Sequence, residues 1–185
     1  MAIKPVELAE SYRLLNLGPT VMVSAKAHGV ENVMSCAWNM PVEYDQMQVS
    51  LGKQSYTRRL VEESGFFVIN VPTKQLIPQV LAVGSESYAD NPHKLDTVKF
   101  FHQPEFDLPL VEGAAAWLVC RLRSNPAVQE AHDLFLGDVV AAWADDRVFR
   151  DGHWHFEDAP DALRTIHYIA GGQFYVIGES VNYSK

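Results

Sequence analysis

The chain lacks the features that mark secreted, membrane-spanning or disulfide-stapled proteins. Its 185 residues include only two cysteines, Cys36 and Cys120, which lie far apart and without the short spacing of a zinc or redox motif. No apolar run is long enough to cross a bilayer, and the N-terminal residues carry acids without the apolar stretch of a signal peptide. We therefore expect a cytoplasmic protein with no structural disulfide and no membrane segment.

The sequence also has little positive charge and few of the motifs that identify common enzymes. The net charge of −8 argues against binding to nucleic acid or to an anionic membrane, because both need a cationic surface. The glycine-rich motifs of dinucleotide-binding and P-loop folds are missing, as are a nucleophile elbow, a zinc-protease motif and a paired-carboxylate motif. These absences exclude the best-marked enzyme families but leave room for a local basic pocket.

What the sequence does contain is a pattern of many strands with few helices. Apolar residues make up 48% of the chain, which suits a single domain over residues 1–185. Helical patterns cover 5–16, 56–64 and 74–83, and a polar loop covers 84–98. Alternating or continuous apolar stretches predict strands at 19–27, 32–38, 47–51, 66–71, 114–124, 134–143, 166–169 and 173–178. Because the helices do not alternate strictly with the strands, we predict a mainly β (α+β) fold, an antiparallel barrel with a few added helices.

A basic, hydroxyl-rich turn precedes the helix predicted at 56–64. Lys53, Ser55, Thr57 and Arg58 lie where this helix begins, and a helix N-terminus offers unpaired N–H groups and a partial positive charge. Such a turn can hold a phosphate group through charge-assisted hydrogen bonds. The alternative is that Ser55 only caps the helix and that the basic side chains are solvated.

The strand predicted at 32–38 carries an unusual mixture of side chains. Because side chains alternate along a strand, one face holds an amide, a thioether, a thiol and an indole, while the other is small. Buried amide and indole N–H groups need partners, and a planar, partly polar ligand could supply them. The alternative is a barrel rim without a ligand. The first face comprises Asn32, Met34, Cys36 and Trp38, and the second comprises Val33, Ser35 and Ala37.

Single titratable residues elsewhere give weaker signals. His132 begins the apolar stretch predicted as a strand, and an imidazole there could donate a proton or a hydrogen bond to a ligand. His153 and His155 alternate, but no third ligand is fixed near them, so we expect surface histidines on a hairpin and no metal site. Lys94 lies in the polar loop, where a lysine is ordinarily solvated.

Taken in order along the chain, these segments resemble a known family. The segments are NVMSCAW, VSL, SYTRRL, GFFVINVP, a loop ending in HKL, AHDLFLGDVV and HYIAGGQFY. The set resembles the flavin reductase-like family of FMN-binding split barrels, and within it the flavoredoxin branch, from about residue 17 to residue 178. The resemblance implies an antiparallel split β-barrel of Greek-key type, normally a homodimer with FMN near the subunit interface.

The resemblance also implies roles for individual residues. Ser55 and Thr57 would bind the FMN phosphate with Lys94, and residues 32–38 would line the isoalloxazine, with Trp38 packing near it. His132 matches a histidine on the nicotinamide or acceptor side. Tyr168 and the glycine pair after it match a segment that approaches the cofactor. The family loop often shows Ser-Gly before Asp-Lys, whereas here the lysine follows His93.

The implied function is that of an FMN-dependent oxidoreductase. NAD(P)H would pass hydride to the flavin, which would reduce free flavin, another small acceptor or a partner protein. One alternative is a flavoredoxin-type electron carrier that takes electrons from a protein and not from a nicotinamide. Another is a barrel without flavin that serves as a small-molecule-binding module or a structural dimer.

Overall fold

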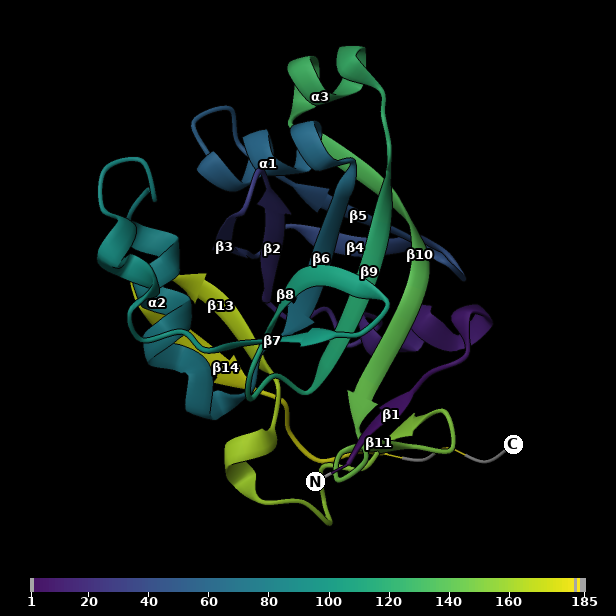
Figure 1. The fold of residues 1–185 in the computed structure, drawn as a ribbon. Helices are drawn as coiled ribbons and strands as arrows, with labels where there is room; N and C mark the ends of the chain where they lie inside the picture. Colours follow the sequence, from purple (N-terminus) through teal and green to yellow (C-terminus); the bar gives the residue numbers. More distant parts are fainter. Residues whose placement is uncertain (1, 182, 184–185) are drawn as a thin grey trace.

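A single curled antiparallel sheet forms the frame of the molecule in the computed structural model, which describes residues 2–181 and 183 (Figure 1). Its strand order is β3-β2-β6-β9-β10-β5-β4, and β1 also pairs with β10. Neither end of this path pairs with the other, so the barrel is split, as the resemblance implies. The strands are β1 (Ile3–Pro5), β2 (Val21–Ala27), β3 (Val30–Cys36), β4 (Asn39–Glu43), β5 (Gln46–Ser50), β6 (Phe66–Val71), β9 (Ala116–Arg123) and β10 (Leu134–Asp145).

Helices and three hairpins surround this sheet. The α-helices are α1 (Tyr56–Ser64), α2 (Ile77–Ser85) and α3 (Pro126–His132), with 3-10 turns η1 (Leu8–Leu14), η2 (Lys74–Leu76), η3 (Pro92–Leu95) and η4 (Asp161–Leu163). The hairpins are β7 (Phe100–Gln103) with β8 (Phe106–Val111), β11 (Phe149–Arg150) with β12 (His153–Trp154), and β13 (Ile166–Ala170) with β14 (Gln173–Val176). Figure 1 shows α2 beside β13 and β14 on one side of the barrel and α3 at one end.

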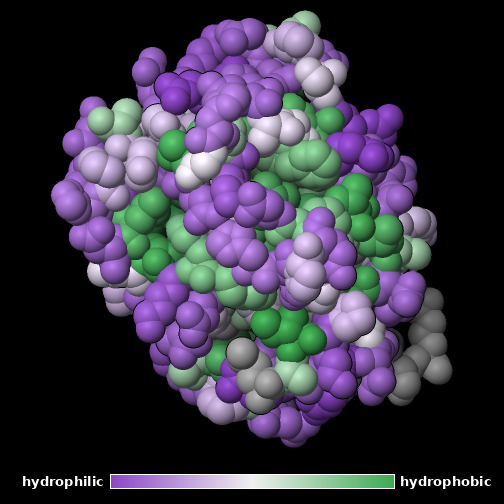
Figure 2. All heavy atoms as spheres, in the orientation of Figure 1, coloured by the Kyte–Doolittle hydropathy of each residue, from purple (hydrophilic) through white to green (hydrophobic). Residues whose placement is uncertain are grey.

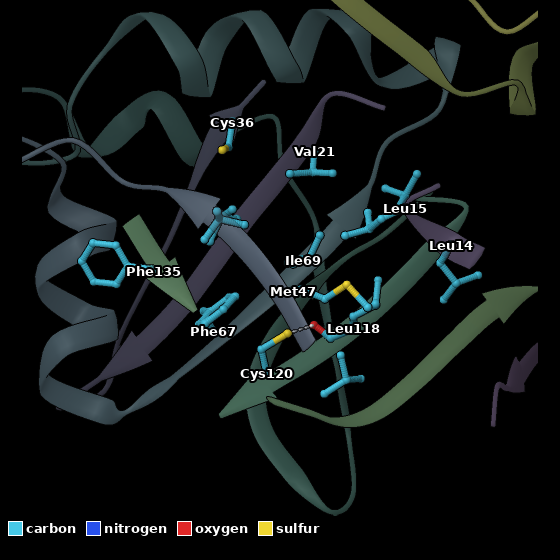
Figure 3. Close-up of a cluster of buried hydrophobic side chains, with 14 of the residues drawn as sticks. Leu14, Leu15, Val21, Cys36, Met47, Phe67, Ile69, Leu118, Cys120 and Phe135 are labelled. Atoms are coloured by element: carbon cyan, nitrogen blue, oxygen red, sulfur yellow. Dashed lines mark hydrogen bonds between the residues drawn. The ribbon is translucent and has the colours of Figure 1, made fainter. Parts of the chain in front are cut away.

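The central strands are buried on both faces because two apolar clusters lie on opposite sides of the sheet. The cluster inside the barrel includes Phe67, Ile69, Leu118 and Phe135, which converge between the strands in Figure 3. The outer cluster, under α2 and the β7–β8 hairpin, includes Trp117. This double burial explains why β6 is apolar in the sequence apart from Asn70, whose buried side chain is hydrogen-bonded to β2 and β8.

On the face shown in Figure 2 most residues are hydrophilic, and apolar patches lie between them. No helix among the described residues has the length and apolarity needed to cross a bilayer.

Several predicted elements are confirmed, including the residues that begin and end α1. Ser55 caps the helix, with its hydroxyl oxygen accepting from the N–H of Arg58 at 3.4 Å. Gly65 ends it in the left-handed conformation with φ of 73°. Gly171 and Gly172 form the turn between β13 and β14 with φ of 58° and 82°.

Other predictions were wrong at the level of elements. The helix predicted at 5–16 is shorter and of 3-10 type, because residues 3–5 instead pair with β10 as strand β1. The short strand β4 and the β7–β8 hairpin were missed. His132 does not begin a strand: it is the last residue of α3, and Asp133, with φ of 57°, separates this helix from β10.

Candidate functional site

Two contiguous cavities form a trough along the free edge of β3, where α1 and α2 both contact this strand. One cavity of about 200 Å³ lies at the start of α1, and the other of about 320 Å³ lies between α2 and the β13–β14 hairpin. They share Ser35, Gly84 and Ser85 in their walls. Because β3 pairs only with β2 among the described residues, its other edge offers free backbone groups to a ligand.

The polar end of the trough is built on the first turn of α1. The Thr57 side chain is fully buried, and its hydroxyl accepts a hydrogen bond from the Asn32 amide at 2.8 Å. Its own proton is therefore free to be donated into the cavity. The Ser55 hydroxyl contacts the Met34 sulfur at 2.8 Å, a weak acceptor that a stronger one could replace.

Asn32 shows that this end of the trough is incomplete without a ligand. The residue is 1% exposed, and its carbonyl oxygen Oδ1 has no hydrogen-bond partner among the described residues. Leaving a buried acceptor unpaired costs about 1–3 kcal/mol. A ligand with a hydroxyl group beside an anionic group would pair with both this oxygen and the donors at the helix start.

Lys94 supplies the positive charge of the same cavity. Its turn, η3, brings the side chain inward, so that the residue is only 7% exposed. The ammonium donates to the backbone oxygens of Val83 at 3.4 Å and Glu86 at 3.1 Å. Among the described residues no carboxylate lies within ion-pairing distance of it. Burial lowers its pKa to about 8, and the Glu86 carboxylate, whose residue also lines the cavity, opposes this shift only in part. An anion in the cavity would restore the missing charge partner.

The other end of the trough is apolar and aromatic. It is lined by Thr20, Ala37, Val80, Leu81, Tyr168 and Phe174. The Tyr168 and Phe174 rings lie 5.2 Å apart, and the Tyr168 backbone N–H donates to the Thr20 hydroxyl at 2.7 Å, which holds β13 against the barrel. Such a wall suits a planar ring system.

Sequence reasoning missed two tyrosines of the polar cavity, Tyr56 and Tyr88. Their rings lie 4.9 Å apart and line the cavity near the start of α1, with the Arg59 guanidinium 4.6 Å from the Tyr56 ring centre. Tyr56 belongs to the SYTRRL segment, so its position beside the capping serine was a readable signal. Tyr88 lies in the loop after α2, and only the fold brings it to α1.

Not all predicted site residues lie in the trough. Asn32, Met34, Ser35, Ala37, Ser55, Thr57, Lys94 and Tyr168 line it. Cys36 lies inside the barrel, with its thiol 3.2 Å from the Trp38 backbone oxygen, and burial raises its pKa. Trp38 lies beyond the end of β3 and is 78% exposed. His132 is exposed at the end of α3, outside both cavities.

The two basic residues flanking the capping serine also point elsewhere. Lys53 pairs with Glu130 of α3 at 3.3 Å. Arg58 is 4% exposed and pairs with Glu62, Glu130 and Asp133 at 3.0, 3.2 and 2.6 Å. The turn therefore presents the hydroxyls of Ser55 and Thr57 to the cavity, and Lys94, from another segment, lines the same cavity as the cation.

Known proteins share the sequence and the fold of this chain. A model of the flavin reductase like domain matches residues 15–164. The uncharacterized protein YddH of Escherichia coli K12 is 39% identical over 186 residues, covering 96% of each chain. A crystal structure from Shewanella baltica OS155, described as an FMN-binding domain of a flavin reductases-like enzyme, is 49% identical with a TM-score of 0.97, covering 99% of this chain and 98% of that one.

More distant structures share the fold alone. Flavoredoxin of Desulfovibrio vulgaris (Miyazaki F) aligns with a TM-score of 0.73 at 21% identity, covering 90% of each chain. The matched family model begins just after η1 and ends before β13, so it covers the polar end of the trough but not Tyr168 and Phe174 of the aromatic end. The chain therefore belongs to the flavin reductase like domain family.

Proposed function

We propose that this chain binds FMN in the trough and acts as an NAD(P)H-dependent oxidoreductase that reduces a small-molecule or protein acceptor. The phosphate would lie between the start of α1 and Lys94, the ribityl hydroxyls beside Asn32, and the isoalloxazine along the edge of β3 toward the aromatic end. Support comes from the family, from the 49% identical FMN-binding relative and from the chemistry of the trough.

The observation that carries the proposal is the buried ammonium of Lys94. It has no carboxylate partner among the described residues, and it shares a cavity with the hydroxyls of Ser55 and Thr57. A buried cation with only the more distant Glu86 carboxylate as a counter-charge is unfavourable in the empty protein, so its retention makes sense when an anionic ligand forms a direct pair with it. One dianionic phosphate meets that need.

The protein's contribution to the reaction is binding, orientation and exclusion of water. FMN, held by Ser55, Thr57 and Lys94, would supply the hydride and electron chemistry when bound. The polar end fixes the position of the ligand, while Tyr168 and Phe174 form a wall that keeps water from the ring end. Hydride transfer depends chiefly on proximity, so no residue of the trough needs to act as an acid or base.

We also propose that the functional unit is a homodimer, and that Trp38 and His132 reach a cavity only through a second copy. Edge strand β4 and its flanks expose a stripe of large apolar side chains, although a register irregularity between Pro41 and Glu43 interrupts their alternation: Trp38, Met40, Val42 and Tyr44. Such a stripe is typical of a covered surface. We expect sedimentation to give twice the monomer mass. Met40→Glu should shift the protein to a monomer, whereas Lys4→Glu, on strand β1 and outside the stripe, should leave the dimer unchanged.

The test of the main proposal is an absorbance spectrum of protein saturated with FMN and then desalted. We expect the flavin spectrum to be retained and to bleach when NADH or NADPH is added without oxygen. A retained spectrum that does not bleach would favour the flavoredoxin-type carrier, and reduction by a protein donor would then be measured. Protein that takes up no FMN would contradict the proposal and favour a barrel without flavin.

A further inference from the structure

A second group of potential ligands lies away from the trough, on the outer side of the barrel. Glu31 of β3, His102 of β7 and Asp107 of β8 each point one ligand atom toward the others, and these three atoms lie within 4.8 Å of one another. None of the three residues lines either cavity of the trough. Among residues 2–181 and 183 no other such group of three is present.

The strands fix the backbone positions of this group. Glu31 lies opposite Lys26 in the β2–β3 register, so both side chains emerge on the same face. His102 lies at an irregularity in the β7–β8 register, between Phe101 and Gln103. A bulge of this kind redirects a side chain, and here the imidazole Nε2 reaches the Glu31 carboxylate at 2.6 Å.

The hairpin that carries two of the ligands is itself anchored to the barrel. The buried Ser24 hydroxyl of β2 donates to the Pro109 backbone oxygen of β8 at 2.5 Å. The rest of β8, from Leu108 to Val111, is buried in the outer cluster. The ligand atoms therefore come from a supported frame and not from a mobile loop.

A cation already lies between the two carboxylates of the group. The Lys26 ammonium lies 2.5 Å from Asp107 Oδ1 and 3.3 Å from Glu31 Oε1. Its position shows that the two carboxylates converge on one point where positive charge is favoured. With a neutral imidazole, the three ligands carry two negative charges, which matches a divalent ion better than a single ammonium.

We propose that Glu31, His102 and Asp107 bind a divalent transition metal ion, with Zn²⁺ as the expected occupant, in competition with the Lys26 ammonium. Imidazole nitrogen and carboxylate oxygen are ordinary zinc ligands, and three protein ligands leave a fourth position for water. Tetrahedral coordination requires ligand atoms about 3.4 Å apart, given bonds of about 2.0–2.2 Å. The exposed Asp107 side chain can supply the small movement needed once Lys26 swings out.

The metal would join the β7–β8 hairpin to strands β2 and β3. Because it binds the folded frame and not the separated ligands of the unfolded chain, it raises the unfolding temperature as its concentration rises. The site is independent of flavin binding, so its test uses the metal alone.

The test is titration of the EDTA-treated, desalted full chain with Co²⁺, followed by visible absorbance, and with Zn²⁺, followed by the unfolding temperature. We expect saturable binding, weakened at least about tenfold in His102→Ala. Lys26→Met should tighten binding about tenfold, because it removes the competing ammonium without removing a ligand. His93→Ala is the matched control: His93 also faces an acid, Asp96 at 3.3 Å, but has no third ligand, so binding should not change.

The proposal is overturned if the wild-type chain gives no saturable signal with excess metal. It is overturned equally if His102→Ala binds as tightly as wild type, which would place the metal elsewhere, or if Lys26→Met leaves the affinity unchanged. Both substitutions lie on the barrel surface, so a thermal unfolding transition close to that of wild type without metal establishes that the variants are folded.

Discussion

Arg58 and Lys94 are both buried cations, and the protein treats them in opposite ways. Arg58 is 4% exposed and has three carboxylate partners, with the Phe135 ring 5.2 Å from its guanidinium. Lys94 is 7% exposed and donates only to backbone oxygens. Arg58 joins α1 to α3 and is complete, whereas Lys94 faces a cavity and is incomplete.

The presence or absence of carboxylate partners distinguishes a buried cation that stabilises the fold, such as Arg58, from one that is available to a ligand, such as Lys94. The charge of a buried cation that is paired with carboxylates is compensated within the chain, so it gives no reason to expect a ligand beside it. Lys94 forms no ion pair, and it lies in the same cavity as the unpaired Asn32 oxygen and a Thr57 hydroxyl that has a free proton. A ligand could pair with all three groups. The same helix turn contributes to both, because Thr57 and its neighbour Arg58 point to opposite sides.

The largest expected effect is on FMN binding when the unpaired set is removed. Thr57→Ala combined with Lys94→Ala should weaken FMN binding by about 3 kcal/mol or more, given roughly 1.5–3 kcal/mol for a hydrogen bond to a charged group. Fluorescence titration measures this change. Riboflavin, which has no phosphate, is the control ligand, and its affinity should change much less; an unchanged FMN affinity would refute the phosphate site.

Removing Arg58, the cation that is paired with carboxylates, should lower the stability of the fold. Arg58→Ala should lower the free energy of unfolding by about 3 kcal/mol, because three carboxylates lose their shared cation and the guanidinium leaves a gap over Phe135. Denaturant unfolding of the unliganded protein measures it. Arg59→Ala is the matched control, since this exposed neighbour pairs with Glu63 at 3.3 Å and its loss should change stability by less than about 0.5 kcal/mol. An equal decrease in the free energy of unfolding in both variants would contradict a structural role specific to Arg58.

The pH dependence of FMN binding sharpens the comparison further. The pKa of Lys94 is lowered to about 8, so its ammonium loses its proton as pH rises past that value. FMN affinity should therefore fall about tenfold between pH 7 and pH 9, since one pKa unit corresponds to about 1.4 kcal/mol. Lys94→Met should bind FMN weakly at both values, and a wild-type affinity independent of pH would contradict the role of this charge.

The free energy of unfolding of the unliganded protein should increase with pH, whereas FMN affinity decreases, and it should do so over a higher pH range. The folded state holds the Lys94 proton less tightly than the unfolded state, so its destabilising effect is present below pH 8 and fades as pH rises from 8 toward 10.5. Lys94→Met removes an unpaired buried charge and should raise the free energy of unfolding at pH 7 by about 1 kcal/mol. A loss of stability comparable to that of Arg58→Ala would show that Lys94 is structural.

Local patterns determined the elements that depend on neighbouring residues. The capped helix α1 with its glycine stop, the apolar strand β6, the glycine turn between β13 and β14 and the hydroxyls at the start of α1 all follow from short-range chemistry, and all were predicted. The ordered set of segments also identified the family. The short strand β4 was missed because pairing with β5 decides it, whereas α3 was missed although Asn125 and Pro126 are local signals of a helix start.

Only the tertiary structure decided which charges meet. The sequence places Lys53 and Arg58 beside Ser55, yet the fold turns both toward α3. Local patterns gave no reason for Lys94 to meet the hydroxyls, which only the family resemblance implied, and the fold brings it into their cavity from another loop. It likewise gathers Glu31, His102 and Asp107 from three strands, with no spacing that a motif could reveal. The reason is physical: periodicity fixes which face a side chain occupies, but long-range strand pairing and helix packing fix what that face meets.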